Sequence, residues 1–314
     1  MTHAVLLMAY GSPDSADEVE AYYTHIRGGR TPSPEAVEHL KERYALVGGR
    51  TPLLDTTEQV RVALETELVR DGSAERVYIG MKHWHPYIAD TMARMAADGV
   101  RSIRAIALAP HYSRISIGGY RKALEEGNRK LGECFSIEMV ESWHRHPGFI
   151  ALIASLVREA LDRFPAEQRA SVMTVFTAHS LPLRIREWDD PYERELSESA
   201  TAVAAAAGIG EWQIGWQSAG ATGEPWIGPD ILDVLTTLAE RGVKSVLQVP
   251  IGFVSDHLEI LYDIDYEAKT RAAELGLNFR RTALPNALPA FVRTIAAIAR
   301  EPVPASPVPV VATV

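Results

Sequence analysis

The stretch YIGMKHWHPYIADTMARMAADGVRSIRAIALAP, Tyr78–Pro110, decides the fold. Its pattern is that of a short apolar strand, a loop with proline, an amphipathic helix and a second apolar strand that ends at a proline. The stretch QIGWQSAGATGEPWIGPDILDVLTTLAERGVKSVLQVP, Gln213–Pro250, repeats these features in the same order. Strand–helix–strand units build parallel sheets. We therefore predict an α/β protein of two similar doubly wound, Rossmann-like domains, with parallel sheets facing a central cleft.

Strands and helices also alternate along other parts of the chain. The expected strands are Val5–Ala9, Val77–Gly80, Ile103–Ala109, Ser171–Phe176 and Val243–Val249. The expected helices are Asp17–Ile26, Ser33–Val47, Thr56–Asp71, Pro86–Ala97 and Tyr120–Leu131. In open α/β sheets, ligands bind outside the carboxyl ends of the strands, so functional residues are expected just beyond those ends.

The length of the chain predicts two domains. Its 314 residues exceed the size of a usual single hydrophobic core. We place an N-terminal domain at residues 1–143 and a C-terminal domain at 144–285, and we expect a helix at about 286–300 to pack back on the first domain. The last stretch, EPVPASPVPVVATV at 301–314, contains four prolines, which predict an extended, flexible tail.

The composition excludes several classes of protein. A net charge of -9 argues against nucleic acid as a partner. Cys134 is the one cysteine, so a single chain can form neither a disulfide nor a four-cysteine iron–sulfur cluster, and a reducing cytoplasm is the expected location. No uncharged apolar stretch reaches the ~18 residues that a transmembrane helix requires.

Two segments place polar side chains where apolar strands end. TAHSLP, Thr177–Pro182, puts His179 directly after the first of these strands. VPIGFVSDHLEILYDIDYE, Val249–Glu267, leads from the second strand into a helix that carries Glu259. A histidine and a carboxylate brought together can bind a divalent metal or move a proton.

Each of these residues also has a structural interpretation. His179 can cap its own loop, and Glu259 can close a capping box by reaching back to the backbone N–H of Asp256. Asp263 and Glu267 follow Glu259 at spacings of four, so an α-helix would align the three carboxylates on one face. Like charges at this spacing repel by a few tenths of a kcal/mol per pair, which favours a path for cations over a stabilising role.

These segments resemble those of a known family. TAHSLP and GFVSDHLEILYD, together with MAYGSP at Met8–Pro13 and PNALPAF at Pro285–Phe291, are similar to the motifs of the ferrochelatases, closest to the coproporphyrin III ferrochelatases of Gram-positive-type bacteria. The resemblance implies insertion of Fe2+ into coproporphyrin III, giving Fe-coproporphyrin in haem biosynthesis. It also implies that Fe2+ is the substrate metal, that His179 and Glu259 are catalytic and bind it, and that Asp263 and Glu267 continue the metal site, with Mg2+ as an accessory ion.

The resemblance also implies a set of porphyrin contacts. Tyr10 coincides with the tyrosine that faces the porphyrin in the branch of the family that uses coproporphyrin. Coproporphyrin carries four propionates, which call for charge-assisted hydrogen bonds. The further contacts implied by motif position are Arg27, Arg43, Tyr44, Thr51 and Tyr120, and Lys82 and His83 are expected beside them.

Other functions stay open at the level of the sequence. They are a protoporphyrin ferrochelatase, a cobalt or nickel tetrapyrrole chelatase, and a haem carrier without catalysis. A dinucleotide-binding protein is disfavoured because no G-x-G-x-x-G follows an expected strand. The expected partners are coproporphyrin III, Fe2+ and haem-pathway enzymes, and the protein is expected to be a monomer.

Overall fold

The chain divides into two compact units. The structure is a computed structural model that describes residues 2–70, 75–220 and 222–303. The first unit takes in Met1–Trp143, Ser255–Leu258 and Asn286–Val314, and the second takes in His144–Val254 and Glu259–Pro285. Most of the predicted tail, residues 304–314, lies outside the described residues.

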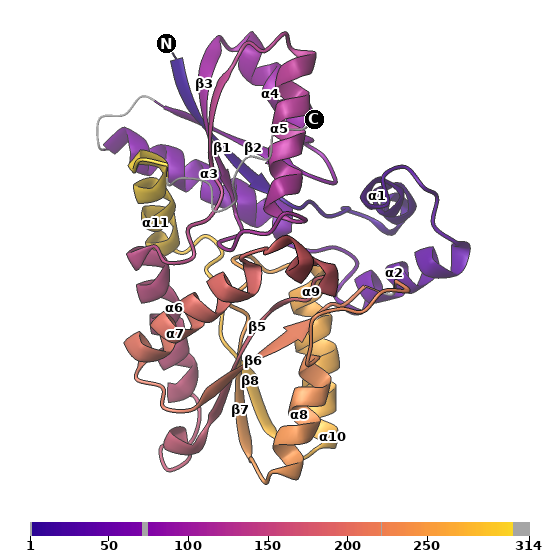
Figure 1. The fold of residues 1–314 in the computed structure, drawn as a ribbon, viewed down its shortest axis with the longest axis vertical. Coiled ribbons are helices and arrows are strands. Elements are labelled where there is room, and N and C mark those ends of the chain that lie inside the picture. Colours follow the sequence, from indigo (N-terminus) through magenta and orange to yellow (C-terminus); the bar gives the residue numbers. More distant parts are fainter. Residues whose placement is uncertain (1, 71–74, 221, 304–314) are drawn as a thin grey trace. The chain divides into compact units, whose positions relative to one another are not determined.

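The first unit is built on a four-stranded parallel sheet in the order β2-β1-β3-β4 (Figure 1). Its strands are β1 (Thr2–Ala9), β2 (Arg76–Met81), β3 (Val100–Ala107) and β4 (Ser136–Val140). Both faces of the sheet are covered, so β1 is apolar without alternation, and its side chains from Ala4 to Ala9 are all buried.

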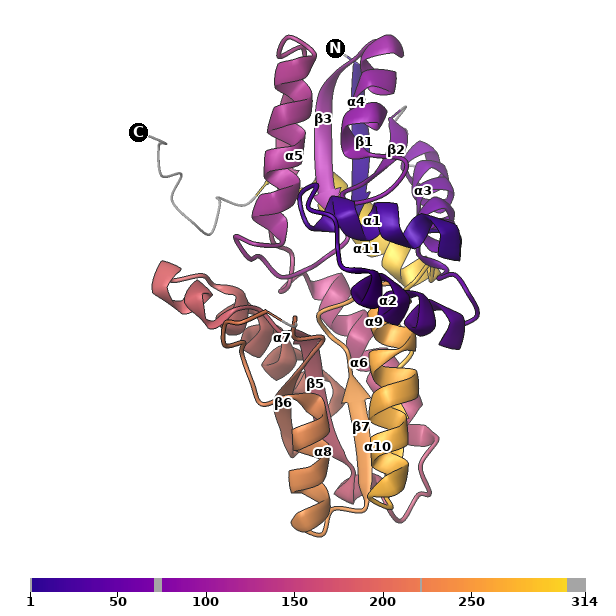
Figure 2. The ribbon, with the colours of Figure 1, turned by 90° about the vertical axis from the view of Figure 1, so that its right-hand side faces the viewer.

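Helices lie on both faces of this sheet (Figure 2). Side chains of α4 (Ile88–Ala97) and α5 (Ile117–Lys130) pack against Leu6 and Met8 of β1. The other helices are α1 (Val19–Ile26), α2 (Pro34–Leu46), α3 (Leu53–Arg70) and α11 (Pro289–Arg300). Of these, α3 packs against β1 and β2, and α11 packs against α3.

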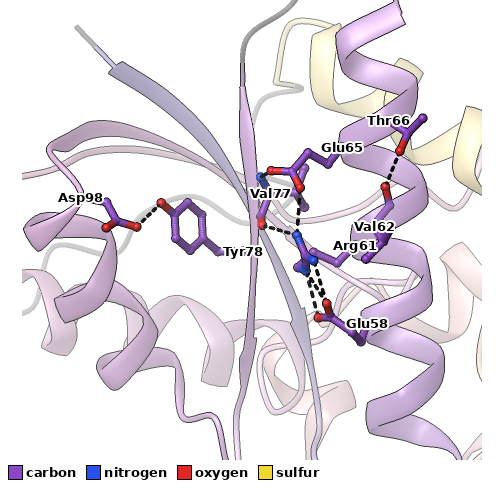
Figure 3. A network of polar contacts seen from close by, with 8 residues as sticks. All are labelled: Glu58, Arg61, Val62, Glu65, Thr66, Val77, Tyr78 and Asp98. Carbon is purple, nitrogen blue, oxygen red and sulfur yellow. Dashed lines mark hydrogen bonds and ion pairs between the residues drawn. The ribbon is translucent and has the colours of Figure 1, made fainter.

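Polar contacts fix α3 to the edge strand β2 (Figure 3). Arg61 on α3 donates to Glu65 at 3.0 Å and to the carbonyl of Val77 at 3.4 Å. The backbone N–H of Val77 donates to Glu65 at 3.2 Å. On the next residue, the Tyr78 hydroxyl donates to Asp98 at 2.7 Å, which ties the same strand to the end of α4. The strand is therefore held from both faces.

The second unit repeats this sheet. Its order is β6-β5-β7-β8, also four-stranded and parallel, so each strand has a counterpart at the same place in the first sheet. The strands are β5 (Met173–His179), β6 (Trp212–Gln217), β7 (Ser245–Val249) and β8 (Asn278–Arg281). The helices are α6 (Pro147–Asp162), α7 (Tyr192–Ala207), α8 (Ile231–Glu240), α9 (Leu258–Leu261) and α10 (Lys269–Glu274). Short 3₁₀ turns span Ala16–Glu18, Arg169–Ser171 and Leu183–Trp188.

The predicted repeat corresponds to β2-α4-β3 and β6-α8-β7, which confirms the fold class of two similar α/β halves. The match extends to the loops. The N–H of Met81 donates to the carbonyl of Pro86, and the N–H of Trp216 donates to the carbonyl of Pro229. Pro229 is therefore the counterpart of Pro86, and both residues follow cis peptide bonds.

One helical expectation is wrong. The helix expected to carry Glu259, Asp263 and Glu267 is not a continuous α-helix, because residues Asp263–Ala268 form a π-helix between α9 and α10. The N–H of Glu267 reaches back five residues to the carbonyl of Tyr262 at 2.9 Å. Residues four apart lie on one face of an α-helix but not of the wider π-helix. The three carboxylates therefore do not share a common helix face.

Candidate active site

His179 lies at the carboxyl end of a central strand of the second sheet. It is the last residue of β5, because the strand extends three residues beyond Phe176, where the sequence predicted its end. The loop after β7 packs directly beside it, since the N–H of Gly252 donates to the carbonyl of Thr177 at 3.2 Å. A Cβ on Gly252 would lie 2.5 Å from the Cβ of Ala178, so only glycine allows this approach. The two conspicuous sequence segments thus meet at one point.

His179 and Glu259 face each other in the second unit. The Nε2 atom of His179 lies 3.5 Å from Oε1 of Glu259. On its other side, Nδ1 of His179 is hydrogen-bonded to the carbonyl oxygen of Ser180, which can only accept, so Nδ1 carries a proton. Nε2 is therefore the nitrogen that is able to exchange a proton or bind a metal. Both side chains are partly accessible, at 32% and 28% exposure, as a site that exchanges ions requires.

The surroundings of His179 favour its protonated form. Burial acts to lower its pKa, but the charge of Glu259, the hydrogen bond to that carboxylate, the Ser180 carbonyl and Asp263 together raise the pKa to about 9. In the metal-free protein the pair is therefore an imidazolium–carboxylate pair at neutral pH. A cation that binds there must displace the proton.

The Asp256 backbone has a partner other than Glu259. Its N–H donates to Oδ1 of Asn286 at 2.9 Å, and Nδ2 of Asn286 donates to the Asp256 carboxylate at 2.7 Å. Asn286 thus accepts the hydrogen bond from the Asp256 N–H that Glu259 would accept in a capping box. The side chain of Glu259 faces His179.

Asp263 and Glu267 differ from each other in their surroundings. Asp263 is buried and accepts a hydrogen bond from the hydroxyl of Ser218, whereas Glu267 is half-buried. Within residues 2–70, 75–220 and 222–303, no group of three or more histidine, cysteine, aspartate or glutamate side chains is placed to hold a metal ion. His179 and Glu259 are thus the two predicted ligands that the structure brings into contact.

Tyr10 follows the central strand of the first sheet. Gly11, with a φ of +98°, turns the chain immediately after it, and a Cβ there would lie 2.8 Å from the backbone nitrogen of Trp84. The Tyr22 hydroxyl donates to the Gly11 carbonyl at 3.1 Å and fixes this turn. The Tyr10 side chain is 40% exposed, and its ring lies 4.5 Å from that of His83.

His83 links Tyr10 to a second histidine. Its Nδ1 lies 3.3 Å from Nδ1 of His25. Burial, with Lys82 and His25 nearby, lowers the pKa of His83 to about 3, so this imidazole is neutral at physiological pH. A neutral ring beside Tyr10 provides a hydrogen-bonding surface without charge.

Tyr44 and Thr51 are brought together through Ser12. The Thr51 hydroxyl donates to Ser12 Oγ at 2.8 Å, and Ser12 Oγ lies 3.1 Å from the Tyr44 hydroxyl. All three residues are buried. Tyr44 and Thr51 were expected at the site from the sequence, whereas Ser12 was not, although this serine lies within the MAYGSP segment.

Tyr120 is paired with Lys82. Nζ of Lys82 lies 5.2 Å from the centre of the Tyr120 ring and donates to the carbonyl of Ser116 at 3.4 Å. A Cβ on Gly119 would lie 2.4 Å from Nζ, so the glycine before Tyr120 leaves room for the lysine. Burial lowers the pKa of Lys82 to about 8 and raises the pKa of Tyr120.

The two predicted arginines occupy different environments. Arg27 caps the end of α1, is exposed, and lies 5.7 Å over the ring of Tyr23. Arg43 lies on α2 and is half-buried. Tyr44 beside it joins Val19 of α1 in one apolar cluster, which holds the two helices together.

Comparison with known proteins is consistent with this geometry. The family model described as Ferrochelatase matches residues 2–303. A ferrochelatase of Herpetosiphon aurantiacus is 51% identical over 290 residues, which cover 92% of this chain and 95% of that protein. The coproporphyrin III ferrochelatase of Bacillus subtilis is 43% identical over 297 residues, with 94% and 96% covered.

The fold has counterparts among solved structures. The sirohydrochlorin chelatase SirB from Bacillus subtilis subspecies spizizenii, in complex with cobalt, matches with a TM-score of 0.57 at 13% identity, covering 96% of this chain and 94% of that one. At this identity the likeness shows the fold alone.

Proposed function

Since the chain belongs to the ferrochelatase family, we propose that it inserts Fe2+ into coproporphyrin III and produces Fe-coproporphyrin in haem biosynthesis. The observation that carries this proposal is the contact between His179 and Glu259, 3.5 Å apart at the carboxyl end of the second sheet. Iron insertion requires a site that holds a divalent cation briefly and accepts protons from two pyrrole N–H groups. A histidine–carboxylate pair meets both requirements.

The pair is proposed to alternate between a proton and a metal ion. In the resting protein Nε2 of His179 carries a proton because its pKa is about 9. Fe2+ displaces that proton, binds His179 and Glu259, and then enters the ring. Two pyrrole protons leave as the metal enters: Nε2 of His179 takes up one of them, and water takes up the other, as it does the proton that Fe2+ displaced. The raised pKa favours the transfer to Nε2, since it makes the freed imidazole a good proton acceptor.

The first unit is proposed to hold the propionates. Arg27 and Arg43 supply permanent charge, and the hydroxyls of Tyr44, Thr51 and Tyr120 supply neutral donors. Remote contacts of this kind provide binding energy that can be used to distort the macrocycle for metal entry.

Tyr10 supports the choice of coproporphyrin. The residue is exposed directly after β1, and it matches the tyrosine of the branch that uses coproporphyrin. Seven of the related ferrochelatases, 41% to 43% identical to this chain, are named for coproporphyrin III.

Further parts of the proposal concern ions, partners and location. Asp263 and Glu267 are proposed to guide the cation, with Mg2+ as an accessory ion. The chain is proposed to act as a cytoplasmic monomer that meets haem-pathway enzymes. No helix within the described part of the chain is long and apolar enough to cross a membrane.

The decisive experiment is anaerobic Fe2+ insertion, followed by absorbance, with coproporphyrin III and protoporphyrin IX compared on the purified protein. We expect faster turnover of coproporphyrin III. A preference for protoporphyrin IX would overturn the proposal that coproporphyrin III is the substrate. Tight haem binding without insertion into either porphyrin would favour a haem carrier.

The His179→Ala variant tests the role of the pair. Insertion is expected to fall by at least about a hundredfold, the size of a lost acid–base group. Coproporphyrin binding, measured by fluorescence quenching, should stay within twofold, because its proposed donors lie in the first unit. Weakened porphyrin binding with normal turnover of the bound fraction would refute this role.

A further inference from the structure

The side-chain amide of Gln217 contacts the backbone of the metal-binding segment. Gln217 is the last residue of β6 and the register partner of His179 on β5. Its Nε2 donates to the backbone carbonyl of Glu259 at 3.0 Å. Its own backbone carbonyl accepts from the N–H of Ser180 at 2.7 Å. Gln217 is therefore hydrogen-bonded both to the residue after His179 and to Glu259 itself.

A second buried amide supports Gln217. Nε2 of Gln248 on β7 lies 3.3 Å from Oε1 of Gln217 and donates to the hydroxyl of Thr177 at 2.9 Å. Gln217 is 1% exposed and Gln248 is fully buried. Buried amides contribute little to hydrophobic stabilisation, and a buried amide that loses its hydrogen-bond partner is costly. A network of this kind therefore fixes the positions of its members more than it adds stability.

We propose that Gln217 is a positioning residue that sets the separation of His179 and Glu259. Glu259 lies in α9, which is only four residues long and ends at Leu261. The π-helix begins at Asp263. So short a helix has little rigidity of its own, and the bond from Gln217 anchors its backbone to the sheet. This inference rests on the proposed metal insertion and adds a residue that determines how well the cation is held.

The test replaces Gln217 by methionine, which keeps a similar volume but neither donates nor accepts this hydrogen bond. We expect the KM for Fe2+ to rise at least tenfold, while the KM for coproporphyrin III stays within twofold. The ratio of Zn2+ to Fe2+ insertion should also change, because the spacing of the two ligands selects the ion. A purely structural role would lower the active fraction and leave both KM values and this ratio unchanged.

Gln213→Met is the matched control. Gln213 lies on the same strand four residues earlier, about 13 Å from Gln217 at ~3.3 Å per residue. The Gln213→Met variant is expected to keep the wild-type KM values for Fe2+ and coproporphyrin III. Gln248→Met removes the support of Gln217 together with the hydrogen bond to Thr177, but keeps the bond from Gln217 to Glu259, and should raise the KM for Fe2+ by about threefold. It carries the test should Gln217→Met fail to fold.

Co2+ titration of the porphyrin-free proteins separates this inference from the proposed function. We expect Gln217→Met to bind Co2+ at least tenfold more weakly than the wild type, whether or not the wild type inserts iron. Wild-type protein that inserts no metal would overturn the proposed function alone. If Gln217→Met had the same KM for Fe2+, the same ratio of Zn2+ to Fe2+ insertion and the same Co2+ affinity as the wild type, the positioning role alone would be overturned.

Discussion

The chain of hydroxyls formed by Ser12, Tyr44 and Thr51 shows how individual residues serve structure and chemistry together. Ser12 is in contact with both of the other two, at 2.8 Å and 3.1 Å. A buried hydroxyl is costly without a partner, so the three groups depend on one another. The hydroxyls of Tyr44 and Thr51 are also proposed to contact a propionate, and Ser12 between them fixes both before the substrate arrives.

Thr51→Val is expected to destabilise the protein by about 1–3 kcal/mol, because valine keeps the shape but removes the donor to Ser12. Urea unfolding measures this change. Thr66→Val is the control, since the Thr66 hydroxyl bonds only within its own exposed helix turn. Equal losses in both variants would contradict a specific role for the buried hydroxyls.

Lys82 gives a residue-scale prediction of pH dependence. Its pKa of about 8 lies below the 10.5 of an ordinary lysine because burial penalises the charged form. Between these pH values the unfolded chain binds more protons than the folded one, so the contribution of Lys82 to stability rises with pH. The penalty is fully present below pH 8 and is removed by about pH 10.5.

Lys82→Met removes this titration. We expect the stability of the variant relative to the wild type to be highest at pH 7 and to decline between pH 8 and pH 10.5. Urea unfolding at several pH values measures the difference. A difference that stays constant across this range would show that Lys82 has an ordinary pKa.

At the scale of elements, the contact between the end of β5 and the loop after β7 sets the geometry of the pair. Gly252 lies against Ala178, one residue before His179, and the same loop continues into α9 and Glu259. The π-helix then turns Asp263 into a buried position bonded to Ser218. The backbone geometry of this segment decides which carboxylates meet the histidine.

Gly252→Ala is expected to cost about 1–3 kcal/mol and to lower insertion more than tenfold, because its Cβ would lie 2.9 Å from the Cα of Ala178 and force the two backbones apart. Thermal unfolding and the insertion assay measure the two effects. Gly210→Ala should change neither, since nothing lies within 4 Å of a Cβ there. If Gly252→Ala had the same stability and insertion rate as the unmodified protein, the loop would be shown to adjust to the added Cβ.

At the scale of the whole molecule, the chain leaves the first unit after Trp143, returns to it briefly at Ser255–Leu258, and returns again from Asn286 onward, where it forms α11. This helix buries Phe291 and Ile295 completely, and the ring of Phe291 lies 6.3 Å from that of Trp143. The first unit is therefore completed by residues that come last in the sequence.

Phe291→Ala is expected to destabilise the protein by about 3–5 kcal/mol, because it opens a cavity in the apolar contact of α11. Arg293→Ala, on the exposed face of the same helix, should change stability by less than about 0.5 kcal/mol. Both are measured by urea unfolding. A small effect of Phe291→Ala would mean that α11 adds little to the first unit.

The sequence by itself determined the repeated strand–helix–strand pattern, the parallel sheets and the family. These properties follow from local periodicity, since buried parallel strands need continuous apolar runs and amphipathic helices need a period of 3.6 residues. It also singled out His179 and Glu259 through their motifs, and these two residues do meet. The strands β4 and β8 were not predicted, because both are short edge strands with polar residues in them.

Only the tertiary structure decided how the site is assembled. The expected row of Glu259, Asp263 and Glu267 assumed an α-helix, and the π-helix changed the rotation between them. Gln217 and Ser218 carry no local signal, and Ser12 has only its place within MAYGSP, because the contacts of all three come from strands and loops that lie far apart in the sequence. Side-chain contacts depend on which strands pair and in what register, and those are properties of the folded chain as a whole.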